Sequence, residues 1–296
     1  TTTAMTVWAL QQLQIPVSYS VGTTLSFGPS GHFDPASEYF VYECDEFDRN
    51  FLHFHPYLSL IASIDYDHPD TYPTQKEYDA AFRQFVDQSK FTILWKKDAV
   101  HIGEIEHAWQ LSNQDIAYVR LPGEHYRRNA SLVAKAVEKL GLPGDPVEVL
   151  NRFPGVDRRF EKLADNLYSD YGHHPVEIAA TLQLATEINK DVVLIYQPHQ
   201  NVRQHEMIDL YTDCFEKATE VYWLPTYLTR ENPALPVLTP QQLTKNVTNL
   251  NSIHLADLND ELWQTIQTAR QRGALVLCMG AGSIDDWVRD RLTASQ

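Results

Sequence analysis

Short apolar runs alternate with amphipathic segments along almost the whole chain, and this alternation constrains the fold more than any other feature of the sequence. A run of about four to eight apolar residues between turn residues is typical of a buried strand. Amphipathic segments between such runs are typical of helices that cover a mostly parallel sheet. We therefore predict an α/β fold. The strands are expected at residues 17–21, 39–44, 58–64, 91–95, 191–196, 220–224 and 273–279.

Three of the amphipathic segments carry clear helix signals. Thr74 and Glu77 have the spacing of a capping box, and Pro175 suits the first turn of a second helix. A third helix is expected to run from Met207 to Ala218, with its sulfur and aromatic side chains used for packing. The apolar stripes of the three helices are Tyr78, Ala81, Phe82, Phe85 and Val86, then Ile178, Leu182 and Ala185, then Met207, Leu210, Tyr211, Cys214 and Ala218.

The length and composition of the chain favour two domains. It has 296 residues, of which 43% are apolar, and this is enough for two separate cores. Glycine and proline cluster in L-G-L-P-G-D-P and R-F-P-G-V, just before a new set of strands. We place a boundary near Pro154, between domains 1–153 and 154–296. The second block is long enough to form a doubly wound domain of its own.

Charge and cysteine usage narrow the class of protein. The chain has 24 basic and 39 acidic residues, a net charge of −15, which argues against a general binder of nucleic acid or membrane surfaces. A locally basic pocket is still compatible with this net charge. The three cysteines, Cys44, Cys214 and Cys278, form no C-x-x-C pair and are interpreted as reduced, mostly buried thiols. Because no apolar stretch reaches roughly 18 to 20 residues, we expect a cytoplasmic protein.

The densest acidic cluster, Y-E-C-D-E-F-D-R-N, follows the strand at 39–44. Glu43, Asp45, Glu46 and Asp48 lie at its carboxyl end, where α/β proteins bind ligands. Carboxylate oxygens there suit Mg²⁺. A solvated acidic loop without a ligand is the alternative.

A second cluster follows the strand at 58–64, in the sequence D-Y-D-H-P-D. It comprises Asp65, Asp67, His68 and Asp70. A lone histidine is more often structural than a ligand. Here, however, we expect two neighbouring strands to deliver acids to the same edge of one sheet, and this favours a functional site.

Two further motifs lie in the second block. D-Y-G-H-H-P-V-E places Asp170, Tyr171 and His173 directly before a helix, and part of it serves as a cap. Paired histidines suggest zinc, but no H-E-x-x-H or cysteine partner is present, so zinc is not favoured. Q-P-H-Q-N-V-R ends a strand with His199 and Arg203, and arginine is a good receptor for carboxylates and phosphates.

Together these motifs resemble the Mur ligases, in particular the branch that joins L-alanine to UDP-N-acetylmuramate. D-Y-G-H-H-P, with R-R-F-E upstream and Q-P-H downstream, is specific to that branch, and the resemblance covers almost the whole chain. The matching segments are T-T-T-A-M (1–5), E-C-D-E-F-D-R-N-F-L (43–52), D-H-P-D-T-Y (67–72), H-Y-R-R-N (125–129), G-V-D-R-R-F (155–160), D-Y-G-H-H-P (170–175), Q-P-H (197–199) and G-A-G-S-I (280–284).

The resemblance implies a fold and a reaction. It implies a central P-loop-type ATPase domain at residues 1–153 and a Rossmann-like carboxyl-terminal domain at 154–296. In this family G-T-H-G-K precedes the threonine run, so the sequence resembles one that starts after the P-loop lysine. Such ligases use ATP and Mg²⁺ to convert the muramate carboxylate to an acyl phosphate, which the amine of L-alanine then displaces. The expected substrates are UDP-N-acetylmuramate and L-alanine, in peptidoglycan precursor synthesis by a monomer or homodimer.

The resemblance also implies roles for individual residues. Glu46, His68, Arg159 and Asp170 would be catalytic. Thr1, Glu46 and His68 would hold Mg²⁺. The nucleotide would contact Thr1, Thr2, His125, Asn129, Arg158 and Arg159. The incoming amino acid would meet Tyr171, His173, His199 and Arg203.

The chain departs from the family pattern at Ser63, Tyr126 and Gln200, where the family has Asn, Asn and Arg. It departs also at Gly22-Thr23, where the family has Gly-Gly. The change at Gln200 bears most directly on the amino-acid site. Two other functions stay open. One is a recycling ligase that adds a whole peptide, although D-Y-G-H-H-P and Q-P-H favour a single amino acid. The other is a divergent, weakly catalytic or non-catalytic nucleotide-binding relative, which the departures favour. Without a P-loop lysine, the isolated chain is expected to bind ATP weakly and to show no ligase turnover.

Overall fold

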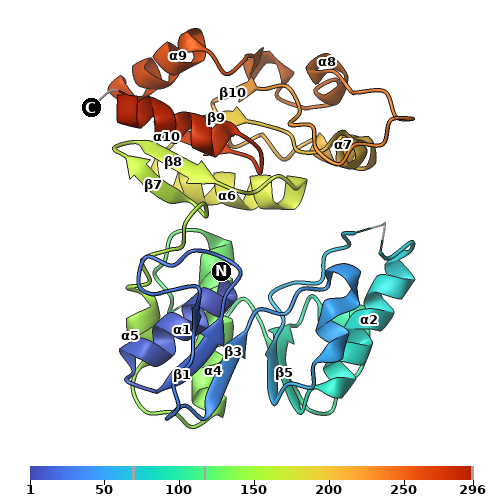
Figure 1. Cartoon of the computed structure of the whole chain (residues 1–296), viewed down its shortest axis with the longest axis vertical. Helices are drawn as coiled ribbons and strands as arrows, with labels where there is room; N and C mark the ends of the chain where they lie inside the picture. Colours follow the sequence, from blue (N-terminus) through green and yellow to red (C-terminus); the bar gives the residue numbers. More distant parts are fainter. Residues whose placement is uncertain (69–70, 117, 295–296) are drawn as a thin grey trace. The chain divides into compact units, whose positions relative to one another are not determined.

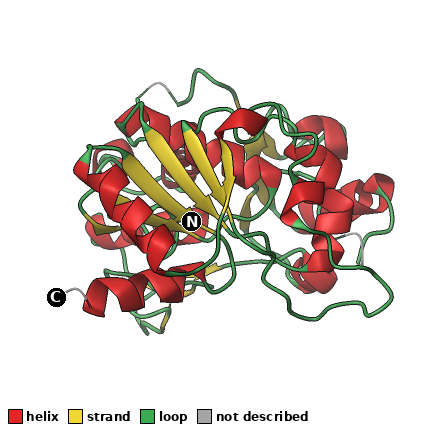
Figure 2. Ribbon diagram, turned by 90° about the horizontal axis from the view of Figure 1, so that it is seen from above, coloured by secondary structure: helices red, strands yellow, loops and turns green. Residues whose placement is uncertain are grey.

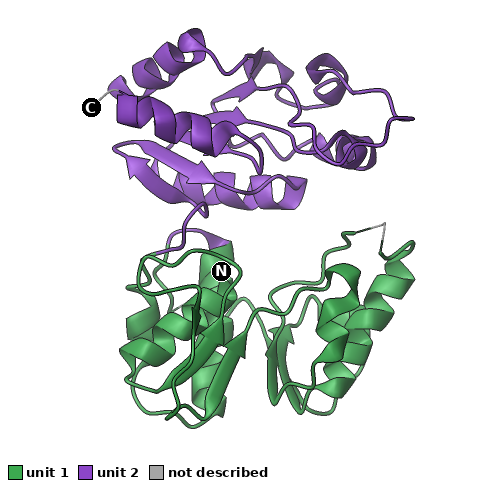
Figure 3. Ribbon diagram, in the orientation of Figure 1, with its two compact units in different colours: residues 1–121, 125–154 green, residues 122–124, 155–296 purple. Residues whose placement is uncertain are grey.

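The computed structural model describes residues 1–68, 71–116 and 118–294. These residues form two compact units (Figure 3). Unit 1 comprises Thr1–Leu121 and His125–Pro154, and unit 2 comprises Pro122–Glu124 and Gly155–Gln296. Within the described ranges, no helix combines the length and the apolar character needed to cross a bilayer.

Unit 1 contains two small sheets and the helices around them (Figure 1). Its elements are α1 (Thr2–Gln12), β1 (Val17–Ser20), β2 (Gly31–His32), β3 (Tyr39–Tyr42), the 3₁₀ segment η1 (Phe47–His53), β4 (Leu58–Leu60), α2 (Gln75–Gln88), β5 (Phe91–Trp95), α3 (Ala99–Ile102), β6 (Ala108–Leu111), α4 (Glu124–Lys139) and α5 (Pro146–Leu150).

Helix α2 illustrates how the sequence produces these elements. The Thr74 side chain accepts a hydrogen bond from the N–H of Glu77 and so caps the first turn. The predicted apolar stripe is buried, and Phe82 and Phe85 pack on Phe51. The prediction of this helix is confirmed.

The two strands that precede the acidic clusters do not lie side by side, and here the sequence-based expectation is wrong. Strand β3 is the edge of the sheet β2-β1-β3, whereas β4 is the edge of the separate parallel sheet β4-β5-β6. The second strand is also shorter than predicted, because the chain leaves the ladder after Leu60. Ile61 still donates to Ile93 O, but the N–H of Ile64 points to the buried Asp98 carboxylate.

Unit 2 is built on a six-stranded sheet in the order β11-β10-β9-β12-β8-β7, parallel except for the β7–β8 pair. Its elements are β7 (Glu161–Ala164), β8 (Leu167–Asp170), α6 (Pro175–Ile188), β9 (Val192–Tyr196), α7 (Asn201–Met207), η2 (Ile208–Tyr211), β10 (Glu220–Trp223), α8 (Pro240–Leu243), η3 (Leu250–Ser252), β11 (Ile253–Leu255), α9 (Asp260–Gln271), β12 (Leu275–Met279) and α10 (Ile284–Ala294).

The sheet of unit 2 is covered on both faces (Figure 2). Leu194 and Tyr196 of β9 pack in a core that includes α6, whereas Val193 and Ile195 pack in a core that includes α9 and α10. This alternation follows from the two-residue period of a strand. The prediction of an α/β protein with a doubly wound second block is confirmed.

The third predicted helix is only partly correct. The α-helix ends at Met207, and the chain continues through η2 into turns. This tightening leaves Leu210 55% exposed, while Tyr211, Cys214 and Ala218 stay in the core as predicted. All three cysteines are free thiols, with Cys44 only partly buried.

Candidate functional site

The structure brings Glu46 and His68 together in unit 1, although their strands belong to different sheets. Glu46 precedes η1 and His68 lies in the loop after β4. The Nε2 atom of His68 is 3.5 Å from Oε1 of Glu46. The same Nε2 atom is 3.7 Å from Oδ2 of Asp67. The edge of the Phe47 ring lies against the imidazole, with the centroids 5.1 Å apart.

The backbone around this pair adopts a conformation that is rare for non-glycine residues. Asp48, Arg49 and His68 have φ angles of 52°, 59° and 58°. Such left-handed residues cost roughly 1–3 kcal/mol each and persist only where the surrounding structure holds them. In this loop the N–H of His68 donates to Oδ1 of Asp67 at 2.7 Å. The pair therefore has a fixed geometry.

Tyr72 connects the two segments that carry this pair. Its side chain is fully buried, and its hydroxyl donates to the carbonyl oxygen of Glu46 at 2.6 Å. Its N–H donates to the carbonyl oxygen of His68 at 2.8 Å. The hydroxyl of Tyr66 donates to the Tyr72 carbonyl oxygen at 2.7 Å.

The Glu46–His68 pair can supply part of a cation site. Among the described residues no group of three or more His, Cys, Asp or Glu side chains has the arrangement of a metal site. Mg²⁺ nevertheless binds through one or two protein side chains when phosphates and water supply the remaining ligands. The carboxylate of Glu46 fits that role, whereas nitrogen is an unusual Mg²⁺ ligand. Asp70 of the same motif lies outside the described residues.

The other predicted site residues of unit 1 lie at helix starts. Thr1 is the N-cap of α1, and Thr2 is its first residue. Helix α4 begins at Glu124 and places the half-buried His125 and Asn129 one turn apart. Tyr126, one of the departures from the family pattern, is a buried core residue whose ring contacts that of His125.

In unit 2 the predicted residues gather at the carboxyl ends of the parallel strands. Asp170 ends β8, and its carboxylate is buried. Its two oxygens accept the N–H groups of Phe160 and Gly172 at 2.8 and 2.7 Å. Burial raises the pKa of Asp170 to about 6, although Arg159 and the two N–H groups favour the charged form.

Glu177 belongs to the same cluster and was missed in the sequence. Its Oε1 atom is 3.1 Å from Nη1 of Arg159, and its Oε2 atom accepts the N–H groups of His173 and His174. Burial opposes ionisation of Glu177, but these partners outweigh it and lower its pKa to about 2. The sequence does carry a signal for Glu177, because it lies three residues after the helix cap His174. In the structure the two residues form a capping box.

The hydrogen bonds of His173 define its protonation. Its Nε2 atom lies 2.7 Å from Nη1 of Arg203, and because a guanidinium only donates, Nε2 must accept. Its Nδ1 atom lies 3.3 Å from the carbonyl oxygen of Tyr171, which fits a proton on Nδ1. His173 is therefore a neutral imidazole that holds the Arg203 side chain in place.

His199 lies beside His173 and is also neutral. Its ring stacks on Tyr227 with centroids 5.8 Å apart and contacts the His173 ring edge-on at 5.6 Å. Burial, with the nearby Arg203 cation, lowers the pKa of His199 to about 4. Near neutral pH the cluster therefore presents a guanidinium between uncharged rings.

A buried set of polar side chains lies behind the two histidines. The Tyr196 hydroxyl lies 3.0 Å from both the His173 carbonyl oxygen and the Tyr211 hydroxyl. The Tyr211 hydroxyl lies 2.7 Å from Oε1 of Gln204, whose Nε2 donates to the His199 carbonyl oxygen at 3.0 Å. The backbone positions of His173 and His199 are thus linked through the core of unit 2.

Arg158, Arg159 and Tyr171 form the other side of this cluster. The guanidinium carbons of Arg158 and Arg159 lie 4.7 and 5.6 Å from the Tyr171 ring centroid. Nε of Arg158 is 3.4 Å from the Asp285 carboxylate. The structure therefore brings together all the predicted site residues of unit 2.

The G-A-G-S-I motif has a packing role that its sequence did not reveal. A Cβ atom on Gly282 would lie 2.6 Å from Oε1 of Gln197 and from Tyr227. Oε1 of Gln197 accepts the N–H of Ile284 at 3.0 Å. Gln200 has a φ of 59°, and its N–H donates to the Tyr227 carbonyl oxygen. The glycines thus allow the loop after β12 to approach the loop after β9.

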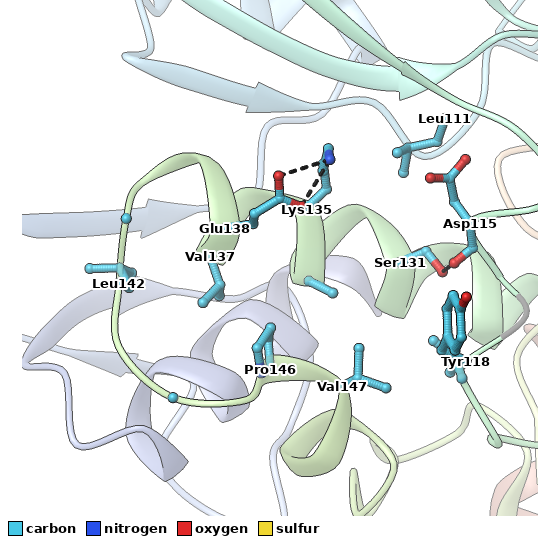
Figure 4. A pocket seen from close by; sticks show the side chains of 14 residues that line it. Leu111, Asp115, Tyr118, Ser131, Lys135, Val137, Glu138, Leu142, Pro146 and Val147 are labelled. Carbon is cyan, nitrogen blue, oxygen red and sulfur yellow. Dashed lines mark hydrogen bonds and ion pairs between the residues drawn. The ribbon is translucent and has the colours of Figure 1, made fainter.

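A separate cavity of about 510 Å³ lies in unit 1 between α4 and the turn before α5. Figure 4 shows Lys135 and Glu138 paired at its wall, with Leu142, Pro146 and Val147 among the apolar lining residues. None of the predicted site residues lines it.

Comparison with known proteins places these features in a family context. Residues 158–282 match the family described as "Mur ligase, glutamate ligase domain". The chain is 30% identical over 272 residues to the UDP-N-acetylmuramate–L-alanine ligase of Salinispora arenicola, covering 77% of this chain and 53% of that protein. It spans roughly half to two thirds of the length of the curated relatives it matches.

Solved structures agree with this fold. The UDP-N-acetylmuramate–alanine ligase of Thermotoga maritima superimposes with a TM-score of 0.74 at 23% identity, over 100% of this chain and 73% of that one. A MurF ligase from the same organism, solved in complex with ADP, gives a TM-score of 0.68 at 12% identity, over 100% of this chain and 78% of that one.

Proposed function

Since this chain belongs to the Mur ligase family, we propose that it carries the ATP-binding and amino-acid-binding parts of a ligase that joins L-alanine to UDP-N-acetylmuramate. Unit 1 would be the central ATP-binding domain and unit 2 the carboxyl-terminal domain. The observation that carries the proposal is the cluster of Arg203, His173 and His199 at the carboxyl ends of the strands. The sequence similarity to alanine ligases supports the choice of substrate.

The proposed reaction has two steps. An oxygen of the muramate carboxylate attacks the γ-phosphorus of ATP, the bond to the β,γ-bridging oxygen breaks, and ADP leaves with the electron pair. The amine of L-alanine, after losing a proton, attacks the acyl carbon, and inorganic phosphate leaves as the amide forms. Because negative charge collects on phosphoryl oxygens, the protein contributes mainly positioning and charge neutralisation.

Unit 1 would supply the nucleotide and metal contacts. Mg²⁺, when bound by Glu46 and His68 with Thr1 on the phosphate side, would neutralise charge on the phosphates. His125 and Asn129 share one face of α4 and are suited to meet the base and ribose. Thr2 would add a contact on the phosphate side. The ADP complex of the structural neighbour is consistent with ATP as the cofactor.

Unit 2 would bind the amino acid and add cationic groups. His173 occupies one N–H of Arg203, which leaves the rest of the guanidinium fork to bind the alanine carboxylate. Tyr171 and His199 would border this position, and the neutral rings would add no competing charge. Arg158 and Arg159 would contact phosphate oxygens, with the buried Asp170 fixing the segment that carries them.

The proposed setting follows from the same assignment. We place the protein in the cytoplasm, in peptidoglycan precursor synthesis, as a monomer or homodimer without nucleic-acid or membrane partners. A ligase that adds a whole peptide and a relative that binds only nucleotide are the competing functions. Glutamine at position 200, in place of the family arginine, favours the second of these.

Calorimetry on the 296-residue chain distinguishes these functions. We expect weak but saturable binding of ATP with Mg²⁺, saturable binding of L-alanine, and weaker binding of glycine than of L-alanine. Preferred binding of a murein tripeptide would instead support the peptide-adding ligase. ATP binding without binding of any amino acid or peptide would support the nucleotide-binding relative. Full-length protein that contains this chain should release phosphate only when both L-alanine and UDP-N-acetylmuramate are present.

A further inference from the structure

We propose that Tyr72 is a positioning residue that sets the separation of Glu46 and His68 and thereby the affinity of this site for a divalent cation. The inference rests on the proposed function, in which these two residues face Mg²⁺. Tyr72 itself would not touch the metal, because its hydroxyl and its N–H are directed to carbonyl oxygens.

Tyr72 contacts both partners at their main chains. Its hydroxyl bonds to the Glu46 carbonyl oxygen at 2.6 Å, and its N–H bonds to the His68 carbonyl oxygen at 2.8 Å. A single side chain and its own backbone therefore join two segments that are 22 residues apart in sequence. The side chains of Glu46 and His68 remain directed at each other, 3.5 Å apart.

The loop that carries Glu46 and the loop that carries His68 do not follow strands of the same sheet. Glu46 follows β3 and His68 follows β4, and these strands are edges of different sheets. Among the described residues, no ladder of backbone hydrogen bonds therefore fixes the distance between the two loops. Since Mg²⁺ holds its ligands at about 2.0–2.1 Å in near-octahedral geometry, the loops need another constraint. Tyr72 provides one.

Packing makes Tyr72 rigid enough for this purpose. Its side chain is fully buried, and the Tyr78 ring packs edge-on against it with centroids 5.0 Å apart. The Arg49 guanidinium lies over the Tyr72 ring, with its central carbon 4.9 Å from the ring centroid. Tyr66 holds the Tyr72 carbonyl oxygen through a 2.7 Å hydrogen bond. The left-handed residues on both loops can persist because this contact network holds them.

The test compares two phenylalanine variants of the 296-residue chain. Tyr72→Phe removes the hydroxyl on Glu46 and keeps the ring. Tyr78→Phe makes the same chemical change in the same aromatic cluster and serves as the matched control. Mn²⁺ affinity is measured by electron paramagnetic resonance of the free ion, with Glu46→Gln as the ligand control, and the melting temperature of each variant is recorded.

We expect Tyr72→Phe to weaken Mn²⁺ binding by about ten-fold, the effect typical of losing a residue that orients a metal ligand. Tyr78→Phe should stay within about two-fold of the unmodified chain, and Glu46→Gln should lose most binding. The same loss in Tyr72→Phe and Tyr78→Phe would indicate general loosening and overturn the positioning role. Unchanged affinity in Tyr72→Phe, with loss in Glu46→Gln, would overturn it and leave the metal site standing. Wild-type affinity in Glu46→Gln, or no Mn²⁺ binding by the unmodified chain, would overturn the metal assignment and this proposal with it.

Discussion

Nη1 of Arg203 donates to Nε2 of His173 at 2.7 Å, and this contact both orients the guanidinium and keeps the imidazole neutral. A lysine at position 203 has no planar fork and holds a carboxylate as a point charge only. We expect Arg203→Lys to weaken L-alanine binding by about ten-fold. The control is Arg272→Lys, at the amino-terminal ends of the strands of the same sheet. This variant should bind L-alanine with unchanged affinity. Calorimetry checks both, and equal affinities would remove Arg203 from the amino-acid site.

Glu177 should be important for the stability of unit 2. Glu177→Ala removes the partner of Arg159 and the acceptor of two backbone N–H groups, so we expect a loss of about 1–3 kcal/mol in the free energy of unfolding. Because the pKa of Glu177 is lowered to about 2, its contribution is present above the unfolded pKa and lost as pH falls through 2.

Glu148→Ala is the control for this prediction. Glu148 forms an exposed ion pair with Arg152, and its removal should change the free energy of unfolding by less than about 0.5 kcal/mol. Urea titration followed by circular dichroism measures both variants. Equal effects of the two substitutions would show that Glu177 is only a surface cap.

His199 should make unit 2 sensitive to acid. Its pKa is about 4 in the folded protein, below the ordinary value of 6.5, so the unfolded chain binds the proton first as pH falls. Its contribution to stability is therefore full above pH 6.5 and declines between 6.5 and 4. The raised pKa of Asp170, about 6, acts in the opposite direction because the folded state takes up that proton first.

A His199→Gln variant isolates the histidine contribution from that of Asp170. We expect the stability difference between wild type and variant to change by about 1–3 kcal/mol between pH 6.5 and 4. Urea titrations at several pH values measure it. Parallel pH profiles for the two proteins would show that His199 does not have a depressed pKa.

Gly282 should tolerate no side chain. A Cβ atom there would lie 2.6 Å from Gln197 and from Tyr227, and Gly282→Ala should destabilise the protein by about 1–3 kcal/mol. Gly31→Ala is the control, because a Cβ atom at Gly31 meets its nearest neighbour at an ordinary 3.7 Å. Thermal unfolding of the two variants is compared, and similar melting temperatures would contradict the close approach of the two loops.

The sequence predicts what depends on local periodicity and capping. The strands around residues 192–196 and 275–279 and the helix after Pro175 appear where the apolar pattern places them. Such patterns record the burial of each residue within its own element. The sequence also indicated which loops carry the candidate site residues, because these loops end the predicted strands.

The relations between distant segments were not accessible in this way. The expectation that β3 and β4 are neighbours is wrong, because strand pairing depends on long-range contacts that alternation does not encode. Glu177 and Tyr72 were missed as site residues for the same reason. Each is an ordinary helix or core residue by its local pattern, and its importance comes from hydrogen bonds to residues that a single sequence does not pair.

The buried hydroxyls behind the two histidines have one more consequence. The hydroxyl groups of Tyr196 and Tyr211 carry one proton each. Three contacts link the His173 carbonyl oxygen, the two hydroxyls and the Gln204 amide oxygen, so there is one contact more than there are protons to donate. If the central contact is formed, only one terminal acceptor can receive a proton. The pair thus has two polarities, one directed at His173 and one directed away from it. Changing from one polarity to the other requires only rotation of the two hydroxyl hydrogens, with no movement of the backbone.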